Sequence, residues 1–481
     1  MLTKTSESTF DALRPTAGSI DVIAVQDLSG LVTDAAASAL RAANAIKNVD
    51  RTPLIGVVSA GVDQVDATLQ KLAGTLDSVS RSTQLLPQML GKDGDRTYLL
   101  LVQNNAEWRS LGGITGSTML LRARHGSFSL ATAEPASSLS SGVTAPLVRL
   151  PDDALDIYGA APAVYFQNLT QLPDFTVGGR IARDMYRVRT GVQVDGVIVI
   201  DPIALSYLLQ ASGPVRLPDG EQLTSRNAPG LLMNEVYLRY KNPADQDAFF
   251  SSAAQSIFSS FLNGGGDTAS TLSAISRAVN ERRILVWSAD SAEQALIAGT
   301  PLAGELPSSD SRTSRFGVFL NDGTGSKMSY YVKPDVQLSW GQCGGGLGDT
   351  PHELTLTLTL TNTAPTDAER TLPPYITGNG AYGIAPGSVS IVPNLYLPPG
   401  YQVASSTTSD GTSFVPGALE GRTVLTYGFV VQPQSSVSLT VVVQARTSAS
   451  KAEAFVTPTA DTTLNPTVAA ECERVPAATL E

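Results

Sequence analysis

The chain has 481 residues, which is too long for one hydrophobic core and therefore indicates two or three domains. Its formal net charge of −11 at pH 7 disfavours a nucleic-acid partner, although arginines grouped locally can still form an anion site. Charged residues make up only 16% of the chain, and the remainder, rich in glycine and small polar residues, is typical of exported β-rich proteins. The two histidines, His125 and His352, lie far apart in sequence and offer little for a histidine metal site or a Ser-His-Asp triad.

Residues 16–90 show helical patterns, and we expect a helical hairpin or stalk as the first domain, residues 1–92. Apolar residues recur there at alternating spacings of three and four, as in a narrow coiled-coil seam: Val62, Val65, Leu69, Leu72, Leu76 and Val79. The seam can pack on the main domain, which is the simplest interpretation, pair with a second copy in a homodimer, or form a stalk. No apolar run reaches the ~20 residues of a membrane span, and the start lacks the apolar core of a signal peptide.

The stretch from Arg96 to Arg124 is the most informative part of the chain. The apolar run 98–102 predicts a buried strand of an α/β sheet. Polar residues follow and predict a loop at the carboxyl end of that strand, where open α/β sheets bind ligands: Gln103, Asn104, Asn105, Glu107 and Arg109. Three glycines in 112–117 extend the loop, and a second strand at 118–121 delivers Arg122 and Arg124. The alternatives are a functional site and a plain hairpin with polar tips.

Residues 93–311 are expected to form the α/β domain. Strands are predicted at 98–102, 118–121, 127–131 and 196–200, and helices around 176–189, 202–210, 227–239, 244–262 and 268–280. Asp201 and Pro202 together predict a helix start, with the aspartate as N-cap. Arg180, Arg183 and Arg187 share one face of the 176–189 helix with few acids between them. Such a face is either solvated or binds an anion such as phosphate.

Residues 312–481 change character and predict an antiparallel β-sandwich of Ig-like architecture. The strict alternation of Leu354–Thr361 is the clearest strand pattern in the chain, and further strands are predicted at 388–396, 422–431 and 436–445. The two cysteines, Cys343 and Cys472, are expected to form one disulfide, which would suit an oxidising compartment. The alternative is a pair of unlinked, buried thiols.

Several motifs resemble a bacterial envelope family, domain of unknown function 4012 (DUF4012). They are LLLVQNNAEWRSLGGITGSTMLL, QNLTQLPDF at 167–175, VDGVIVIDP at 194–202, ASGPV at 211–215, VFLNDGTGSKM at 318–328 and the segment around Cys343, in that order along 90–475. The α/β part is also remotely similar to the LytR-CpsA-Psr (LCP) family, whose domains have an α/β/α sandwich around a mixed sheet. Those proteins are anchored in the plasma membrane with the domain outside, and they transfer polyprenyl-pyrophosphate-linked glycans to cell-wall acceptors using arginines, acids and Mg²⁺.

This second resemblance implies roles for particular residues. Arg109 is similar to that family's first phosphate-binding arginine, and Asn168 to the asparagine of its Lys-Ile-Asn stretch. Two motifs depart from the pattern. Thr132-Ala133-Glu134-Pro135-Ala136 stands where the family has Ser-Ile-Pro-Arg-Asp, and Arg109-Ser110-Leu111-Gly112 lacks the aspartate of Arg-x-Asp-Thr. Glu107, Glu134 or Asp174 are the acids left to hold a metal.

We therefore expect an extracytoplasmic envelope protein, anchored by a segment outside this sequence, that transfers a polyprenyl-linked glycan with the help of Mg²⁺. Arg109, Glu107 and Asp174 are the expected catalytic residues, the two acids also as metal ligands, and an apolar groove along 202–210 and 227–262 would hold the prenyl chain. The remaining expected contacts with the glycan lipid are Asn104, Asn105, Arg122, Arg124, Asn168, Arg180, Arg183 and Arg187. The alternatives are a non-catalytic envelope protein that binds the glycopolymer with a degenerate site, and a glycan hydrolase with paired carboxylates.

Overall fold

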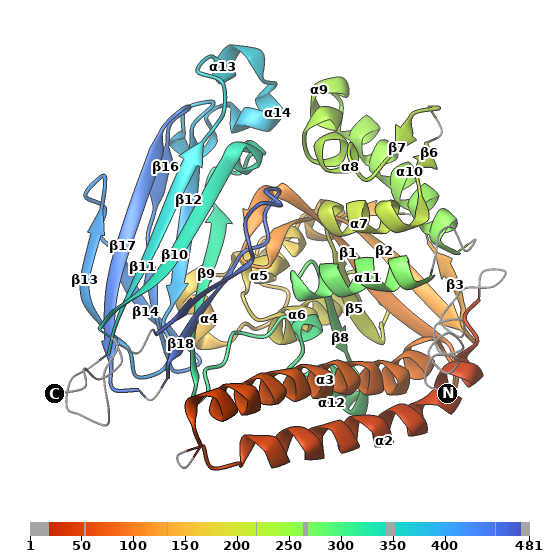
Figure 1. The fold of residues 1–481 in the computed structure, drawn as a ribbon. Coiled ribbons are helices and arrows are strands. Elements are labelled where there is room, and N and C mark those ends of the chain that lie inside the picture. The colour runs from red at the N-terminus through yellow and green to blue at the C-terminus, as the bar shows by residue number, and fades with distance from the viewer. Residues whose placement is uncertain are drawn as a thin grey trace.

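The computed structural model describes residues 19–51, 54–131, 133–217, 219–262, 268–342, 352–447 and 449–472. Two long helices come first, α2 (Val22–Lys47) and α3 (Gly56–Met89). Asp21 caps α2, because its carboxylate accepts hydrogen bonds from the N–H groups of Ile23 and Ala24. The helices run antiparallel and side by side (Figure 1), and Thr33 of α2 is hydrogen-bonded to Ser80 of α3 at 2.8 Å.

The predicted seam of α3 divides into two halves. Leu69 and Leu76 pack with Ala73 of α3 against Ala39 and Ala43 of α2, where small side chains let the helices approach closely. Val65, Leu72 and Val79 of the same seam remain 47%, 48% and 38% exposed. The C-terminal part of α3 packs on the main domain, where Leu85 joins a cluster with Val286 and Ile297. Pairing with a second copy stays a prediction.

A mixed sheet forms the centre of the α/β domain. Its strands lie in the order β3-β2-β1-β5-β8, with β4 beside β2. Only the β1–β5 pair is parallel; the others are antiparallel. The strands are β1 (Arg96–Arg109), β2 (Gly112–Arg124), β3 (Ser127–Leu130), β4 (Glu134–Pro135), β5 (Gly196–Ile200) and β8 (Ile284–Ser288).

Helices cover both faces of this sheet (Figure 1). Val197 and Val199 of β5 pack on the side of α6, whereas Ile198 and Ile200 pack on the side of α3, α7 and α11, as the pleat requires. The helices and the short ribbon are η1 (Ala136–Ser140), α4 (Asp152–Tyr158), α5 (Ala161–Val164), η2 (Phe166–Gln171), α6 (Phe175–Thr190), α7 (Pro202–Ser212), β6 (Val215–Arg216), β7 (Gln222–Leu223), α8 (Ala228–Gly230), η3 (Leu231–Glu235), α9 (Val236–Arg239), α10 (Pro243–Leu262), α11 (Thr268–Asn280), α12 (Ser291–Ile297) and η4 (Pro301–Ala303).

Sequence patterns predicted four helices of this domain closely, but not α4, α5 or α12. The patterns at 176–189, 202–210, 244–262 and 268–280 correspond to α6, α7, α10 and α11 within one or two residues. Asp201 caps α7 by accepting from the N–H of Ala204 at 2.7 Å, and Pro202 is the first helical residue, so the predicted helix start is confirmed. The predicted hairpin strands were too short. β1 runs to Arg109, and the supposed loop at 112–117 is part of β2.

Two sheets form the C-terminal part, which lies beside the α/β domain (Figure 1). One has the order β10-β11-β17-β13, and the other has the order β14-β15-β12-β9-β18-β19 with β16 beside β12. The strands are β9 (Thr313–Asp322), β10 (Val332–Gln342), β11 (His352–Asn362), β12 (Val389–Tyr396), β13 (Gln402–Thr408), β14 (Val415–Leu419), β15 (Arg422–Thr426), β16 (Phe429–Val431), β17 (Ser436–Ala445), β18 (Lys451–Val456) and β19 (Thr467–Glu471). Short helical turns connect them: η5 (Met328–Tyr331), α13 (Ala368–Thr371), α14 (Pro374–Thr377) and η6 (Gly378–Gly383).

The alternation in β11 is confirmed, because its four leucines are buried while its threonines are half-buried. The expectation of a purely antiparallel sandwich is wrong in one place, since β9 and β18 pair in parallel. A parallel pair needs a long crossover, and here most of the sandwich lies between the two strands in sequence. Cys472, just after β19, is disulfide-bonded, and Cys343 of the expected pair lies outside the described residues.

The two parts of the molecule share one core. Trp108 of β1 belongs to the same buried cluster as Phe316, Val318 and Leu320 of β9. The backbone N–H of Ser110 donates to the side chain of Asn321 at 3.0 Å, so polar contacts reinforce the apolar ones. Among the described residues, none of the helices is both long and apolar enough to cross a lipid bilayer.

Candidate functional site: a groove between the two parts

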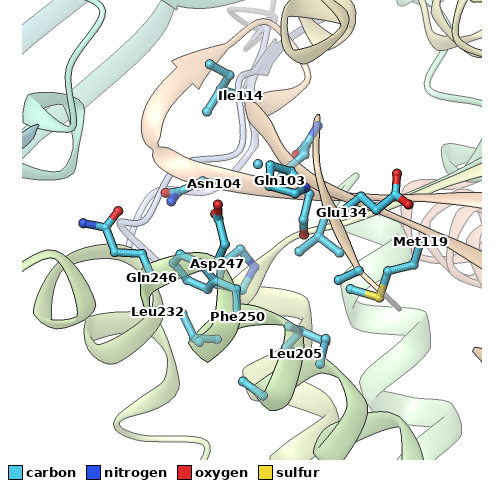
Figure 2. A pocket seen from close by; sticks show the side chains of 18 of the residues that line it. Gln103, Asn104, Ile114, Met119, Glu134, Leu205, Leu232, Gln246, Asp247 and Phe250 are labelled. Carbon is cyan, nitrogen blue, oxygen red and sulfur yellow. The ribbon is translucent and has the colours of Figure 1, made fainter. Parts of the chain in front are cut away.

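An elongated groove opens at the carboxyl end of the parallel strands β1 and β5 (Figure 2). It contains about 890 Å³ of space, counting the part that is open to solvent. Ligands of open α/β sheets bind at this end of the strands. The groove also lies where the sequence places an apolar channel, because α7, η3, α9 and α10 supply one side of it. Lys327 and Tyr375 come from the sandwich, so both parts of the chain build the groove.

One face of α10 forms the longest wall. Gln246, Asp247, Phe250, Ala253, Ala254 and Ile257 recur at helical spacing and all line the groove. Since a helix rises 1.5 Å per residue, this wall is about 16 Å long. Residues of β1 and β2 face it from the other side: Val102, Gln103, Asn104, Ile114, Gly116, Ser117 and Met119. The groove therefore runs between this face of α10 and the hairpin of β1 and β2.

The two ends of the groove differ in chemistry. Asn104, Ile114 and Gln246 lie toward one end, and Met119 and Glu134 toward the other (Figure 2). Asn104 donates from its amide to the hydroxyl of Tyr237, whose ring stacks at a tilt 5.3 Å from that of Tyr375. The ammonium of Lys327 lies about 6 Å from both rings, 6.0 Å and 5.8 Å from their centres. We call the part of the groove formed by Asn104, Tyr237, Lys327 and Tyr375 the Lys327 end.

A bulge in β1 places a carboxylate behind the Lys327 end. Asn104 pairs with Ile114 and Trp108 with the adjacent Gly113, so three residues between them have no partner on β2. Gly113 permits this, because a Cβ atom there would lie 2.3 Å from the carbonyl of Asn104. Glu107 is one of the three bulged residues and is buried. The bulge thus places Glu107 at the junction between the two parts of the molecule.

Glu107 is held between two cations. Its Oε1 lies 2.9 Å from Nη2 of Arg109, and its Oε2 lies 2.6 Å from Nζ of Lys327. The guanidinium of Arg109 also donates to Oδ1 of Asn168 at 2.8 and 3.0 Å, and to the carbonyl of Trp108 at 2.8 Å. The sequence-predicted residues Glu107, Arg109 and Asn168 are therefore brought together. They form an internal ion-pair network in which the guanidinium makes four hydrogen bonds from its five N–H donors.

Burial and charge oppose each other at this network. Burial alone would raise the pKa of Glu107, but the ammonium of Lys327 and the guanidinium of Arg109 outweigh it and hold that pKa below its ordinary value. Burial would lower the pKa of Lys327, yet the carboxylate of Glu107 raises it above the ordinary range. Glu107 and Lys327 are therefore both charged at neutral pH.

Asp322, at the end of β9, is a further acid in this region. Its carboxylate accepts from the N–H groups of Thr324 and Gly325 and from the hydroxyl of Ser329. Burial raises the pKa of Asp322 to about 6, and the nearby charge of Glu107 adds to the rise. Sequence reasoning missed Lys327 and Asp322 as site residues. Their segment carries one of the family-like motifs, but no local pattern shows that Lys327 contacts a residue 220 positions earlier.

Asn104 and Asn105 diverge, although they are adjacent in sequence. Asn104 lines the groove. Asn105 does not line the groove. Its side-chain amide donates to Oδ2 of Asp201 at 3.1 Å and to the carbonyl of Pro458 at 3.0 Å. Arg283, buried beside it, pairs with the same Asp201 oxygen at 2.8 Å and donates to the carbonyl of Thr459. Asn105 therefore belongs to a second buried network that fastens the sandwich to the α/β domain.

The two acids expected to hold Mg²⁺ do not fit that role. Both oxygens of Glu107 already contact cations, and a divalent ion beside Arg109 and Lys327 would be repelled. Asp174 caps α6: its Oδ1 accepts from the N–H of Thr176 and its Oδ2 from the N–H of Leu306. Within the described ranges, moreover, no group of three or more His, Cys, Asp or Glu residues is arranged for a metal. We derive no step through a metal at these residues.

The other arginines expected to bind the glycan lipid do not line the groove. Arg122 and Arg124 stand near the opposite end of β2, where Arg124 pairs with Asp95 at 3.2 Å and both side chains are exposed. On α6, Arg180 and Arg187 are exposed, whereas Arg183 lies over the ring of Trp287 and donates to the carbonyl of Val194. The expected arginine set is therefore not gathered at one place.

The fold and the groove define a class of two-part protein: a mixed α/β domain joined to a β-sandwich, with an apolar slot at their junction. Residues 93–237 match the model of a protein family described as a protein of unknown function, DUF4012. The match confirms, over this range, the DUF4012 resemblance carried by the sequence motifs. The matched range includes the groove-lining residues of β1, β2 and α7. It does not include α10, Lys327 or Tyr375.

Three solved structures are similar to parts of the chain. Protein gbs0355 from Streptococcus agalactiae is 12% identical over 44% of this chain and 74% of its own, with a TM-score of 0.28. The protein described as the transcriptional regulator yvhJ from Bacillus subtilis is 9% identical over 43% and 77%, with a TM-score of 0.24. Lin1025 from Listeria innocua is 11% identical over 47% and 85%, also with a TM-score of 0.24. No curated protein matches the chain.

Proposed function

We propose that the protein binds a linear apolar chain in the groove, namely the prenyl part of a polyprenyl-linked glycan, and acts in the cell envelope as a binding protein. The observation that carries this proposal is the slot itself, about 16 Å long and walled by the face of α10 that runs from Gln246 to Ile257. Burying apolar surface of a flexible chain along such a wall supplies binding free energy roughly in proportion to the area removed from water. Phe250 and Ala254, which are half-buried, provide that surface, whereas Ala253 and Ile257 are already buried and form the floor of the wall.

Binding is favoured over transfer by the placement of positive charge. Transfer of a pyrophosphate-linked glycan requires cations aimed at the phosphates whose charge develops in the transition state. Arg109 already donates hydrogen bonds to Glu107, Asn168 and Trp108. The other expected arginines do not line the groove. Under this proposal the α/β domain is an LCP-like α/β/α unit whose catalytic set is degenerate, and the Ig-like sandwich contributes to ligand binding through Lys327 and Tyr375.

The proposal also sets a location and partners. A prenyl-linked glycan is found at the outer side of a bacterial plasma membrane, so the protein would work there. Its partners would be the lipid-linked glycan or a cell-wall polysaccharide. The sandwich and the exposed half of the α3 seam remain surfaces for assembly.

The test is binding of farnesol, a short prenyl alcohol, followed by native mass spectrometry. Ala254→Trp fills the groove from α10, whereas Gln255→Trp adds the same side chain at the next position, which is exposed and lines no part of the groove. We expect farnesol to stay bound to the parent protein and to Gln255→Trp but not to Ala254→Trp. Thermal unfolding shows whether each variant is folded. Absence of farnesol on the folded parent protein, or equal retention by both variants, would refute the groove as the binding site.

A further inference from the structure

The Lys327 end of the groove carries hydrogen-bond donors for which the described residues provide no acceptor. An ammonium group has three N–H donors, and in the described part of the chain Nζ of Lys327 donates only to Oε2 of Glu107. The hydroxyl of Tyr237 accepts from Asn104, and neither it nor the hydroxyl of Tyr375 donates to any described residue. The side chain of Lys327 is only 10% exposed, so bulk water does not simply take the place of the missing acceptors.

Unused donors that converge beside an apolar slot call for a ligand rich in acceptors. Lys327, Tyr237 and Tyr375 all line the groove, and the rings of the two tyrosines lie about 6 Å from the ammonium. Glu107 cannot satisfy the remaining donors, because it sits behind Lys327 and shares its single charge with Arg109. A group bound on the groove side of Lys327 would meet donors from all three residues. An oxyanion has the oxygens to accept from all of them.

We propose that the Lys327 end binds an anionic head group with several oxygens, namely a phosphate that is attached to the apolar chain in the groove. This inference rests on the proposed function and specifies the ligand and its orientation: the head lies at Lys327, and the chain runs along α10 toward Ile257. Glu134 at the far end disfavours the reverse orientation, since it would meet the anion with a like charge.

Asp247 sets a limit on the affinity of this site. It lies on the same turn of α10 as Gln246 and lines the groove, and burial raises the pKa of its carboxyl. As the acid of α10 that faces the groove, it opposes an anionic ligand. Replacing it with asparagine removes this repulsion and keeps the shape of the side chain. The site therefore predicts opposite effects for Lys327 and Asp247.

The experiment compares farnesyl phosphate with farnesol by titration calorimetry, because the two share one chain and differ only in the head. We expect the parent protein to bind farnesyl phosphate about tenfold more tightly. Lys327→Met keeps the aliphatic stem and leaves Glu107 paired with Arg109, and it should bind both ligands equally. Asp247→Asn should increase the preference. Tyr375→Phe is a milder change that removes one donor from a half-exposed ring, and it should reduce the preference for farnesyl phosphate. This variant replaces Lys327→Met in the test if Lys327→Met does not fold.

The outcomes separate this inference from the proposed function. Equal binding of the two ligands by the parent protein, or a preference that survives in Lys327→Met, would overturn the head-group site while leaving the groove in place. Titration with inorganic phosphate tests whether the Lys327 end binds a free anion instead of the head group of a prenyl chain. If it bound as tightly as farnesyl phosphate, and in a Lys327-dependent way, the anion site would stand and the proposed apolar ligand would fall. Binding of none of the three probes would overturn both.

Discussion

Oε2 of Glu107 lies 2.6 Å from Nζ of Lys327, and this contact joins β1 of the α/β domain to the segment that follows β9 in the sandwich. The two residues are 220 positions apart, and both side chains are nearly inaccessible to water. Arg109 shares the carboxylate from the other side at 2.9 Å. Because Lys327 also lines the groove, the same contact that holds the two parts together positions one end of the candidate binding site.

Removing the charge of Glu107 should destabilise the whole molecule. Glu107→Gln leaves the cations of Arg109 and Lys327 buried without a counter-charge, and such a loss costs about 3–5 kcal/mol. Urea unfolding measures the change in the free energy of unfolding. The control is Asp152→Asn, which removes a partner of Arg149 from an ion pair whose two side chains are 84% and 78% exposed. Equal stability of the two variants would contradict the role given to Glu107.

The stability contribution of Asp322 should depend on pH. Burial raises the pKa of Asp322 from its ordinary 3.8 to about 6 in the folded protein. Between about pH 4 and 6 the folded state therefore keeps a proton that the unfolded chain releases, so stability from this residue falls as pH rises through that window. Above about pH 6 the loss is complete.

Asp322→Asn isolates this effect. The asparagine oxygen can still accept from the N–H groups of Thr324 and Gly325, while the ionisable proton is gone. Relative to the parent protein, the variant should be more stable at pH 7 than at pH 4. A stability difference that is the same at both values would show that Asp322 titrates normally.

The bulge in β1 depends on a glycine opposite it. Gly113→Ala would place a Cβ atom 2.3 Å from the carbonyl of Asn104, and relief of that overlap should cost about 1–3 kcal/mol in unfolding free energy. Gly116 lies in the same strand, and its Cβ would meet Val102 at an ordinary 3.6 Å. Gly116→Ala should leave stability unchanged or raise it by up to about 1 kcal/mol. The reverse order of the two variants would refute the description of the hairpin.

The helical hairpin should depend on close packing of alanines. Ala43 is fully buried between α2 and α3, whereas its neighbour Ala42 is exposed. Ala43→Asp buries a charge against Ala73 and should open the hairpin, while Ala42→Asp should leave it intact. Hydrogen exchange of the backbone amides in α2 and α3 distinguishes this local opening from global unfolding. Similar protection in the two variants would count against the observed contact.

Helix positions were predictable from sequence because their determinants are local. The cap at Asp201 and the apolar periodicity of α10 act within a few residues, whereas Asp174, expected as a metal ligand, is the cap of α6. The helix face that forms the main wall of the groove was predictable for the same reason, but the parts of β1, β2 and the sandwich that complete the groove were not. The alternation in β11 likewise needs only a pleat and one buried face.

The polar residues of the site were predictable as a group but not in their roles. The pattern of Gln103–Arg109 indicated a loop because buried polar side chains are uncommon in strands. The structure satisfies them with partners that are distant in sequence: Lys327 for Glu107, Asn168 for Arg109 and Pro458 for Asn105. Arg183 similarly looked like one of a free set, yet it packs on Trp287 of β8. Only the fold shows which charges are already paired.

The most direct test of the groove is a crystal structure of the protein with farnesyl phosphate. We predict electron density for the prenyl chain along the face of α10 that carries Phe250, Ala254 and Ile257, with the phosphate next to Lys327. Density for the ligand outside this slot, or an empty groove at saturating ligand in a crystal where α10 is free of lattice contacts, would contradict the proposed binding site.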